Sequence, residues 1–151
     1  MKLLLVSLVV PLVLAQVASS AAPSAPPSAP RHFPAADVAA SFARSGPLFE
    51  TTAYQIHTSR RDAPGMVEVH ARETDIMYVL DGRATIVTGG TVVGGKTISP
   101  GEIRGANLRG GKDQTLTKGD VFVVPNGVPH WFRDVPSSIQ YYVVKVTSPA
   151  R

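Results

Sequence analysis

The chain has 151 residues, of which 44% are hydrophobic, and its 15 basic and 11 acidic residues give a formal charge of +4. At about 100–200 residues per domain, this length allows one folded domain and excludes two of ordinary size. The sequence contains no cysteine, which excludes disulfides, thiolate metal ligands and thiol nucleophiles. Thirteen glycines and thirteen prolines indicate many turns and argue against a helical bundle.

The N-terminal segment has the pattern of a targeting sequence. Lys2 precedes an apolar run over residues 3–14, which is shorter than the about 20 apolar residues that span a bilayer. Small residues follow, so residues 1–20 are predicted to be a signal peptide and the protein to be exported, periplasmic or extracellular, without a stable membrane span. An uncleaved membrane anchor is the alternative. Residues 21–34, rich in Ala, Pro and Ser, predict an extended linker.

The folded domain is expected over residues 35–151 and begins with a short predicted helix. Residues 34–46 carry Asp37 as a candidate N-cap, and Gly46 is placed to end the helix. Val38 and Phe42 are spaced as on one helix face.

The rest of the domain reads as strands and turns. Residues 54–58 and 66–70 alternate with the period of half-buried strands. The pair Asp81-Gly82 between two apolar runs predicts a hairpin, and residues 139–146 predict the last strand. Residues 96–112 are turn-rich and form either a long loop or an excursion of the sheet. About eight to ten short strands in one domain predict an all-β sandwich or barrel.

Two separate segments carry the residues with metal chemistry. Glu68 and His70 are two apart, so in a strand both side chains point to the same face, and Asp75 opens the next strand. The second segment places His130 just after a Pro-Asn-Gly turn at residues 125–127. Two imidazoles and one or two carboxylates would suit one divalent ion, but spacing alone leaves open whether the segments meet.

The second segment resembles the second conserved motif of the cupin superfamily, G-x5-P-x-G-x2-H-x3-N. Gly119, Pro125, Gly127 and His130 are in register with this motif, and Asp134 stands where asparagine is usual. The resemblance is to the small single-domain form of the family, of type 2.

The first segment is similar to the first cupin motif, G-x5-H-x-H-x3/4-E-x6-G, in a degenerate form. Asp75 and Gly82 have the spacing of the acid and the last glycine, which puts His70 at the second histidine. Glu68 then replaces the first histidine, and Asp62 stands at the leading glycine. A register with His70 as the first histidine would not supply a second histidine, so the Asp75-Gly82 register is preferred.

The resemblance covers roughly residues 47–147 and implies a jelly-roll-like β-barrel that holds one divalent metal ion. Carried over to this sequence, the ligands would be Glu68, His70, Asp75 and His130. Two histidines and two carboxylates are a chemically harder ligand set than the family's three histidines and one glutamate. The harder set favours Mn or Fe over copper, while Ni and Zn stay open.

Four further residues are candidates for binding a substrate. Arg72 could clamp a carboxylate, or it is a plain surface arginine. Trp131 could line the pocket mouth and Tyr78 could contribute to it, although most such aromatics pack in the core. If the His57 side chain points inward, it could hydrogen-bond to a metal ligand or act as a general base near the metal. If it points outward, it is an ordinary surface histidine.

These features predict an exported metal-binding protein with a small-molecule ligand or substrate. Isomerase, lyase and dioxygenase chemistry on a small oxygenated substrate all stay open, because the fold does not determine the reaction. The alternative is a non-catalytic envelope module that binds a small ligand or is only structural. Scattered basic residues give no support for nucleic-acid binding. A homodimer is expected from the resemblance, with the final strand as an edge that a second copy covers.

Overall fold

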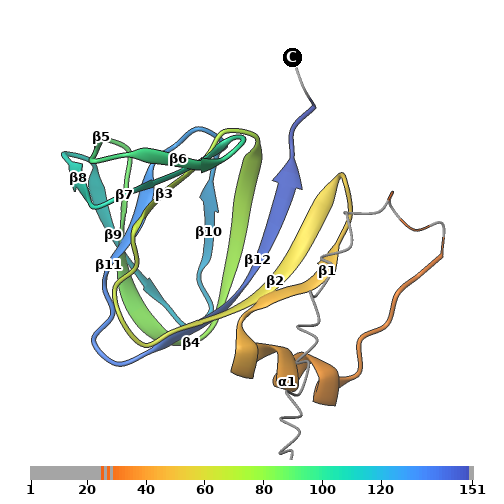
Figure 1. Cartoon of the computed structure of the whole chain (residues 1–151). Coiled ribbons are helices and arrows are strands. Elements are labelled where there is room, and N and C mark those ends of the chain that lie inside the picture. Colours follow the sequence, from red (N-terminus) through yellow and green to blue (C-terminus); the bar gives the residue numbers. More distant parts are fainter. Residues whose placement is uncertain (1–24, 26, 28, 150–151) are drawn as a thin grey trace, which may run out of the picture.

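The computed structural model describes residues 25, 27 and 29–149 (Figure 1). The expected signal peptide lies outside these residues. Among them, no helix has both the length and the apolar character of a membrane span.

Within the described part of the chain, one helix precedes a series of antiparallel strands. The elements are α1 (Ala35–Arg44), β1 (Gly46–Glu50), β2 (Tyr54–Arg61), β3 (Val67–His70), β4 (Glu73–Thr88), β5 (Thr91–Val93), β6 (Lys96–Ser99), β7 (Glu102–Gly105), β8 (Asn107–Arg109), β9 (Lys112–Thr117), β10 (Val121–Val124), β11 (His130–Asp134) and β12 (Ile139–Thr147).

The strands form a sheet that curls on itself. Its order is β1-β2-β12-β4-β11-β3-β7-β6, with β9 and β10 also paired to β4, and β5 and β8 form a separate pair. Figure 1 shows the sheet bending round so that β3, β6 and β7 lie across from β12 and β2. The predicted all-β barrel is therefore confirmed.

Strand β4 runs straight through the position where a hairpin was predicted, so that prediction is wrong. Its first half pairs with β12 and β10, and its second half pairs with β11 and β9. Gly82 has a φ of +78°, and a Cβ on it would lie 2.0 Å from the carbonyl oxygen of Ser138. The pairing of β4 with β12 shifts register next to this glycine, between Gln140 and Tyr141. Gly82 therefore permits a close approach of two strands rather than a reversal of the chain.

Helix α1 lies beside β1 and β2 (Figure 1). Its N-cap is Pro34, whose carbonyl accepts hydrogen bonds from the backbone N–H groups of Asp37 and Val38. The expected N-cap role of Asp37 is therefore wrong, because this residue lies inside the first turn. Phe42 packs edge-on against Tyr142 of β12, with ring centroids 5.3 Å apart.

The turn-rich residues 96–112 are an excursion of the sheet, since they form β6, β7 and β8. Strand β7 pairs with β3 and places Arg104 opposite Glu68 and Glu102 opposite His70. This excursion therefore completes one wall of the barrel next to the predicted ligands.

Two apolar clusters support the site. The main one fills the barrel and includes Met77, Ile86, Phe132, Ile139 and Tyr141. A smaller cluster of Val67, Val87 and Leu108 lies on the other face of the wall. In β3 the alternation thus buries the valines on one face and turns Glu68 and His70 to the barrel interior.

Candidate metal site

The two motifs meet because β3 pairs with β11. Their antiparallel register sets His130 directly opposite Glu68. His70 follows two residues after Glu68 on the same face of β3, and Asp75 enters from β4. The structure therefore brings all four predicted ligands to one corner of the barrel.

The donor atoms lie at distances that suit a shared cation. One atom each from Glu68, His70 and His130 lies within 4.8 Å of the others. The Oε2 atom of Glu68 is 3.6 Å from Nε2 of His70 and 4.0 Å from Nε2 of His130. The Oδ2 atom of Asp75 is 3.4 Å and 3.8 Å from the same two nitrogens. Donor atoms spaced by roughly 3–4 Å match ligands about 2.1 Å from one ion.

His130 is oriented to offer a lone pair to the cluster. Its side chain is buried, and burial lowers the pKa of its imidazole, which favours the neutral form. Its Nδ1 donates to the carbonyl oxygen of Val128 at 3.2 Å. A neutral imidazole has one N–H, so Nε2 carries the lone pair and faces Glu68 and Asp75.

His70 is held by a carboxylate behind it. Its Nδ1 donates to Oε2 of Glu102 at 2.5 Å, the arrangement that orients histidine ligands of metals. Burial lowers the pKa of His70, but Asp75 and Glu68 raise it more strongly, to about 10. The two carboxylates therefore favour a proton or another cation at its Nε2 atom.

Two arginines hold the Glu68 carboxylate. Arg61 donates to Oε1 at 2.9 Å, and Arg104 lies 3.0 Å from Oε2. Burial by itself raises the pKa of Glu68, but His70, Arg61 and Arg104 together hold it well below its usual range. Glu68 is therefore a fixed carboxylate anion inside the barrel.

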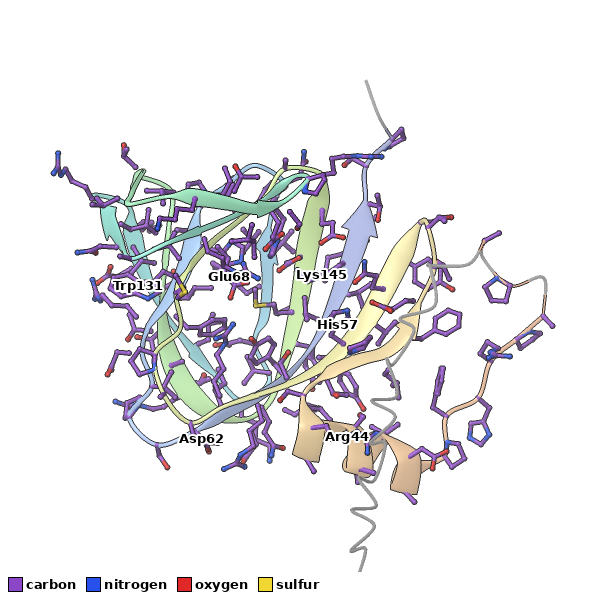
Figure 2. All side chains as sticks on the ribbon, viewed as in Figure 1. Arg44, His57, Asp62, Glu68, Trp131 and Lys145 are labelled. Carbon is purple, nitrogen blue, oxygen red and sulfur yellow. The ribbon has the colours of Figure 1, made fainter. Side chains whose placement is uncertain are left out.

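A lysine that is not among the predicted site residues reaches the same corner. Lys145 of β12 is paired with Asp75 of β4, and its Nζ lies 2.8 Å and 3.0 Å from the two oxygens of that carboxylate. The same Nζ is 2.9 Å from Nε2 of His70. Burial raises the pKa of Asp75, but His70 and Lys145 lower it overall. Figure 2 shows Lys145 and Glu68 directed into the barrel interior from different strands.

A cavity of about 240 Å³ adjoins these residues. It lies below the range of about 300–1,000 Å³ typical of sites for drug-sized ligands, so it suits a small molecule. It is lined by His57, Ser59, Arg61, Glu68, His70, Asp75, Met77, Arg104, His130, Phe132, Tyr141, Val143 and Lys145.

Of the four predicted substrate-binding residues, His57 alone lines this cavity. Its Nε2 is 2.8 Å from Oε1 of Gln55, and burial and Lys145 lower its pKa. Tyr78 is 47% exposed on the outer face of β4. Trp131 packs against the smaller apolar cluster outside this cavity, and its Nε1 donates to the carbonyl oxygen of Gly65 at 2.7 Å.

Arg72 is exposed in the bend between β3 and β4 and donates to the carbonyl oxygen of Ser148 at 3.0 Å. It lines a neighbouring cavity of about 250 Å³, which shares His70 with the first and is also lined by Glu102, the residue behind His70. Arg72 therefore lies on the far side of His70 from the donor atoms.

Two of the unforeseen residues had a signal in the sequence. Lys145 is the single charged residue of its strand, and its spacing of two and four residues from Val143 and Tyr141 places it on the same inward face. Arg61 is likewise four residues after His57 in β2, so the two side chains lie on one face of that strand. Glu102 and Arg104 come from residues 96–112, where no period indicated a strand.

The fold is a small β-barrel with a candidate metal site, and comparison with known proteins gives its family. The cupin family model matches residues 49–151. The chain therefore belongs to the cupin family. No curated protein sequence matches it.

Solved structures share the fold at low sequence identity. A protein from Bacillus halodurans has a TM-score of 0.51 and 14% identity, covering 71% of this chain and 72% of its own. The cupin domain of Cnp3 from Schizosaccharomyces pombe has a TM-score of 0.51 and 15% identity, covering 69% of this chain and 64% of its own. At such identities the similarity shows the fold alone.

Proposed function

We propose that this cupin binds one divalent metal ion and, beside it, a small oxygenated ligand. The ion is held by Glu68, His70 and His130, with Asp75 as a fourth ligand through Oδ2. Its identity is Mn, Fe, Ni or Zn, and two carboxylates among the ligands favour Mn or Fe.

The observation that carries this proposal is the orientation of the His130 imidazole, whose Nδ1 donates to the Val128 carbonyl and whose Nε2 offers a lone pair to the cluster. Its Nε2 faces oxygens of Glu68 and Asp75 at 4.0 Å and 3.8 Å, which is too far for hydrogen bonds. The His130 lone pair therefore receives no proton from either carboxyl group, and a cation placed among the three acceptor atoms would be stabilised by all of them. Glu102 behind His70 supports the same assignment, because ligating histidines usually donate their other N–H to a carboxylate or carbonyl.

A bound divalent ion would supply a Lewis acid at this corner. Around it, Arg61 and Arg104 hold Glu68 in place, and Glu102 sets the orientation of His70. His57 lines the cavity and is positioned to accept or donate a proton. Isomerase, lyase and dioxygenase reactions on a small oxygenated substrate are the enzymatic versions of this proposal.

A second candidate is a non-catalytic module of the cell envelope, and one observation favours it. The site's carboxylates already have cations: Glu68 has two arginines, and Asp75 has Lys145. Such a network can be stable without an ion, in which case the barrel is structural or binds only a small ligand.

Elemental analysis of purified protein tests the two candidates against each other. The proposal expects stoichiometric metal in wild type, loss of it in His70→Ala and His130→Ala, and no loss in His32→Ala, an exposed histidine outside the barrel. Metal-free wild type that EDTA does not destabilise would favour the module. Stoichiometric metal in both His70→Ala and His130→Ala would overturn the ligand assignment.

Two further proposals concern location and assembly. The N-terminal sequence pattern supports export to the periplasm or the outside of the cell.

A homodimer is supported by an apolar outer face on β4, β10 and β12. The large hydrophobic residues there are between 38% and 65% exposed: Ile76, Tyr78, Val121, Val123 and Val146. The expected edge role of the final strand is wrong, since β12 lies between β2 and β4. The second copy would therefore cover the face of the sheet.

A further inference from the structure

Lys145 makes a contact that a metal-binding histidine does not permit. Its Nζ is 2.9 Å from Nε2 of His70, the nitrogen assigned above to the ion. The Nδ1 of His70 is engaged with Glu102. The form of His70 that binds a metal is the neutral one, whose single lone pair is at Nε2, and in that form Lys145 is placed to donate a hydrogen bond to the same nitrogen.

One lone pair serves one partner. A metal ion and an ammonium cannot both bind Nε2 of His70, and two cations this close repel each other strongly in a buried site. Lys145 must therefore move away from His70 when an ion binds. The ion pair between Lys145 and Asp75 also weakens if Oδ2 of Asp75 becomes a metal ligand. The other carboxylate near Lys145 is that of Glu73, whose Oε2 lies 3.8 Å from Nζ.

The charges around the corner indicate what the displaced ammonium would bind. The carboxylates of Glu68, Asp75 and Glu102 are matched by the cations of Arg61, Arg104 and Lys145. Even when Glu73, whose carboxylate lies 3.8 Å from Lys145, is counted as well, a divalent ion leaves a net positive charge in this largely buried site. An anionic ligand in the adjoining cavity restores the balance.

We propose that Lys145 competes with the metal ion for His70 and, once displaced, binds an anionic ligand beside the ion, so that the cavity takes a metal and a small carboxylate together. This inference rests on the metal site proposed above. It assigns the ligand to the class of small carboxylates and makes Lys145 a residue that binds this ligand.

Titration calorimetry of metal-stripped protein with Mn²⁺ tests the competition. In Lys145→Met, which keeps the chain length and removes the charge, Mn²⁺ should bind at least about tenfold more tightly than in wild type. Lys112→Met removes an exposed lysine of β9 and should match wild type. Lys145→Gln is the second variant if the methionine variant does not fold, and circular dichroism checks each protein.

Repeating the titrations with succinate tests the anion. Succinate also binds free Mn²⁺, but this affects each protein equally, so the comparison between variants is unaffected. Succinate should raise the apparent Mn²⁺ affinity of wild type more than that of Lys145→Met. Equal effects on both would overturn the anion role of Lys145.

The outcomes separate this inference from the metal proposal. If wild type binds Mn²⁺ and Lys145→Met binds it no more tightly, the competition is overturned and the metal site stands. If Mn²⁺ binds to Lys145→Met alone, the competition is supported and the metal function of wild type falls. If it binds to none of the proteins, both proposals fall.

Discussion

Glu68 and His130 are 62 positions apart in the sequence but face each other directly across β3 and β11, with Oε2 and Nε2 4.0 Å apart. This pairing brings the carboxylate of the degenerate motif to the histidine of the well-matched motif. Arg104 is paired with Glu68 from the other side, through β7. Both halves of the site thus depend on the position of one short strand, β3.

Metal removal should lower the thermal stability of the protein. A ligand that binds only the folded state at 100 times its Kd adds about 2.7 kcal/mol to the free energy of unfolding. For a domain of this size, that corresponds to a rise in Tm of about 10 °C. Differential scanning calorimetry with Mn²⁺ and with EDTA measures this shift. Identical Tm values would contradict a metal site in the folded protein.

Glu68→Gln and Glu102→Gln should differ in their effects on metal binding. Glu68 is assigned as a ligand, so its amide variant should lose more than about 100-fold in affinity. Glu102 only orients His70, and its variant should lose about 10–100-fold. Calorimetric titration of both with Mn²⁺ gives the comparison, and a larger loss in Glu102→Gln would reverse the assigned roles.

The metal-free protein should lose stability in acid. The folded protein holds the pKa values of Glu68 and Asp75 below their ordinary values of 4.5 and 3.8. These carboxylates stabilise the folded state fully above those values, and their contribution is lost as the pH falls through the lower folded pKa values. The free energy of unfolding should therefore decrease below a pH of about 4.

Chemical denaturation in EDTA at a series of pH values measures this dependence. Asp75→Asn removes one of the two groups and should flatten the curve in the acid range. Asp134→Asn changes an exposed carboxylate and serves as the control. A curve for Asp75→Asn as steep as that of wild type would contradict the assignment.

Gly82→Ala should destabilise the barrel more than Gly119→Ala. Both glycines have positive φ, which costs about 1–3 kcal/mol for other residues. At Gly82 the new Cβ would also meet the Ser138 carbonyl at 2.0 Å, whereas nothing lies within 4 Å at Gly119. Urea denaturation compares them, and equal losses would show that the close approach at Gly82 is unimportant.

Val123→Glu should convert a dimer into a monomer. Val123 is 50% exposed and paired with Ile76, so a charge there lies in the centre of the apolar outer face. Light scattering coupled to gel filtration gives the mass of wild type and variant. Lys118→Glu, an exposed change outside the strands, is the control. A monomeric wild type at high concentration would contradict the dimer.

The sequence alone determined the all-β character, because period-two alternation and turn residues are local signals. It also indicated His130 through the Pro-Asn-Gly turn, and Glu68 and His70 through their shared face. The tertiary structure alone decided that Lys145, Glu102 and Arg104 join them, since long-range strand pairing and register determine which residues meet. Local chemistry likewise could not tell whether Gly82 turns the chain or lets Ser138 approach, because that depends on which strand packs beside it.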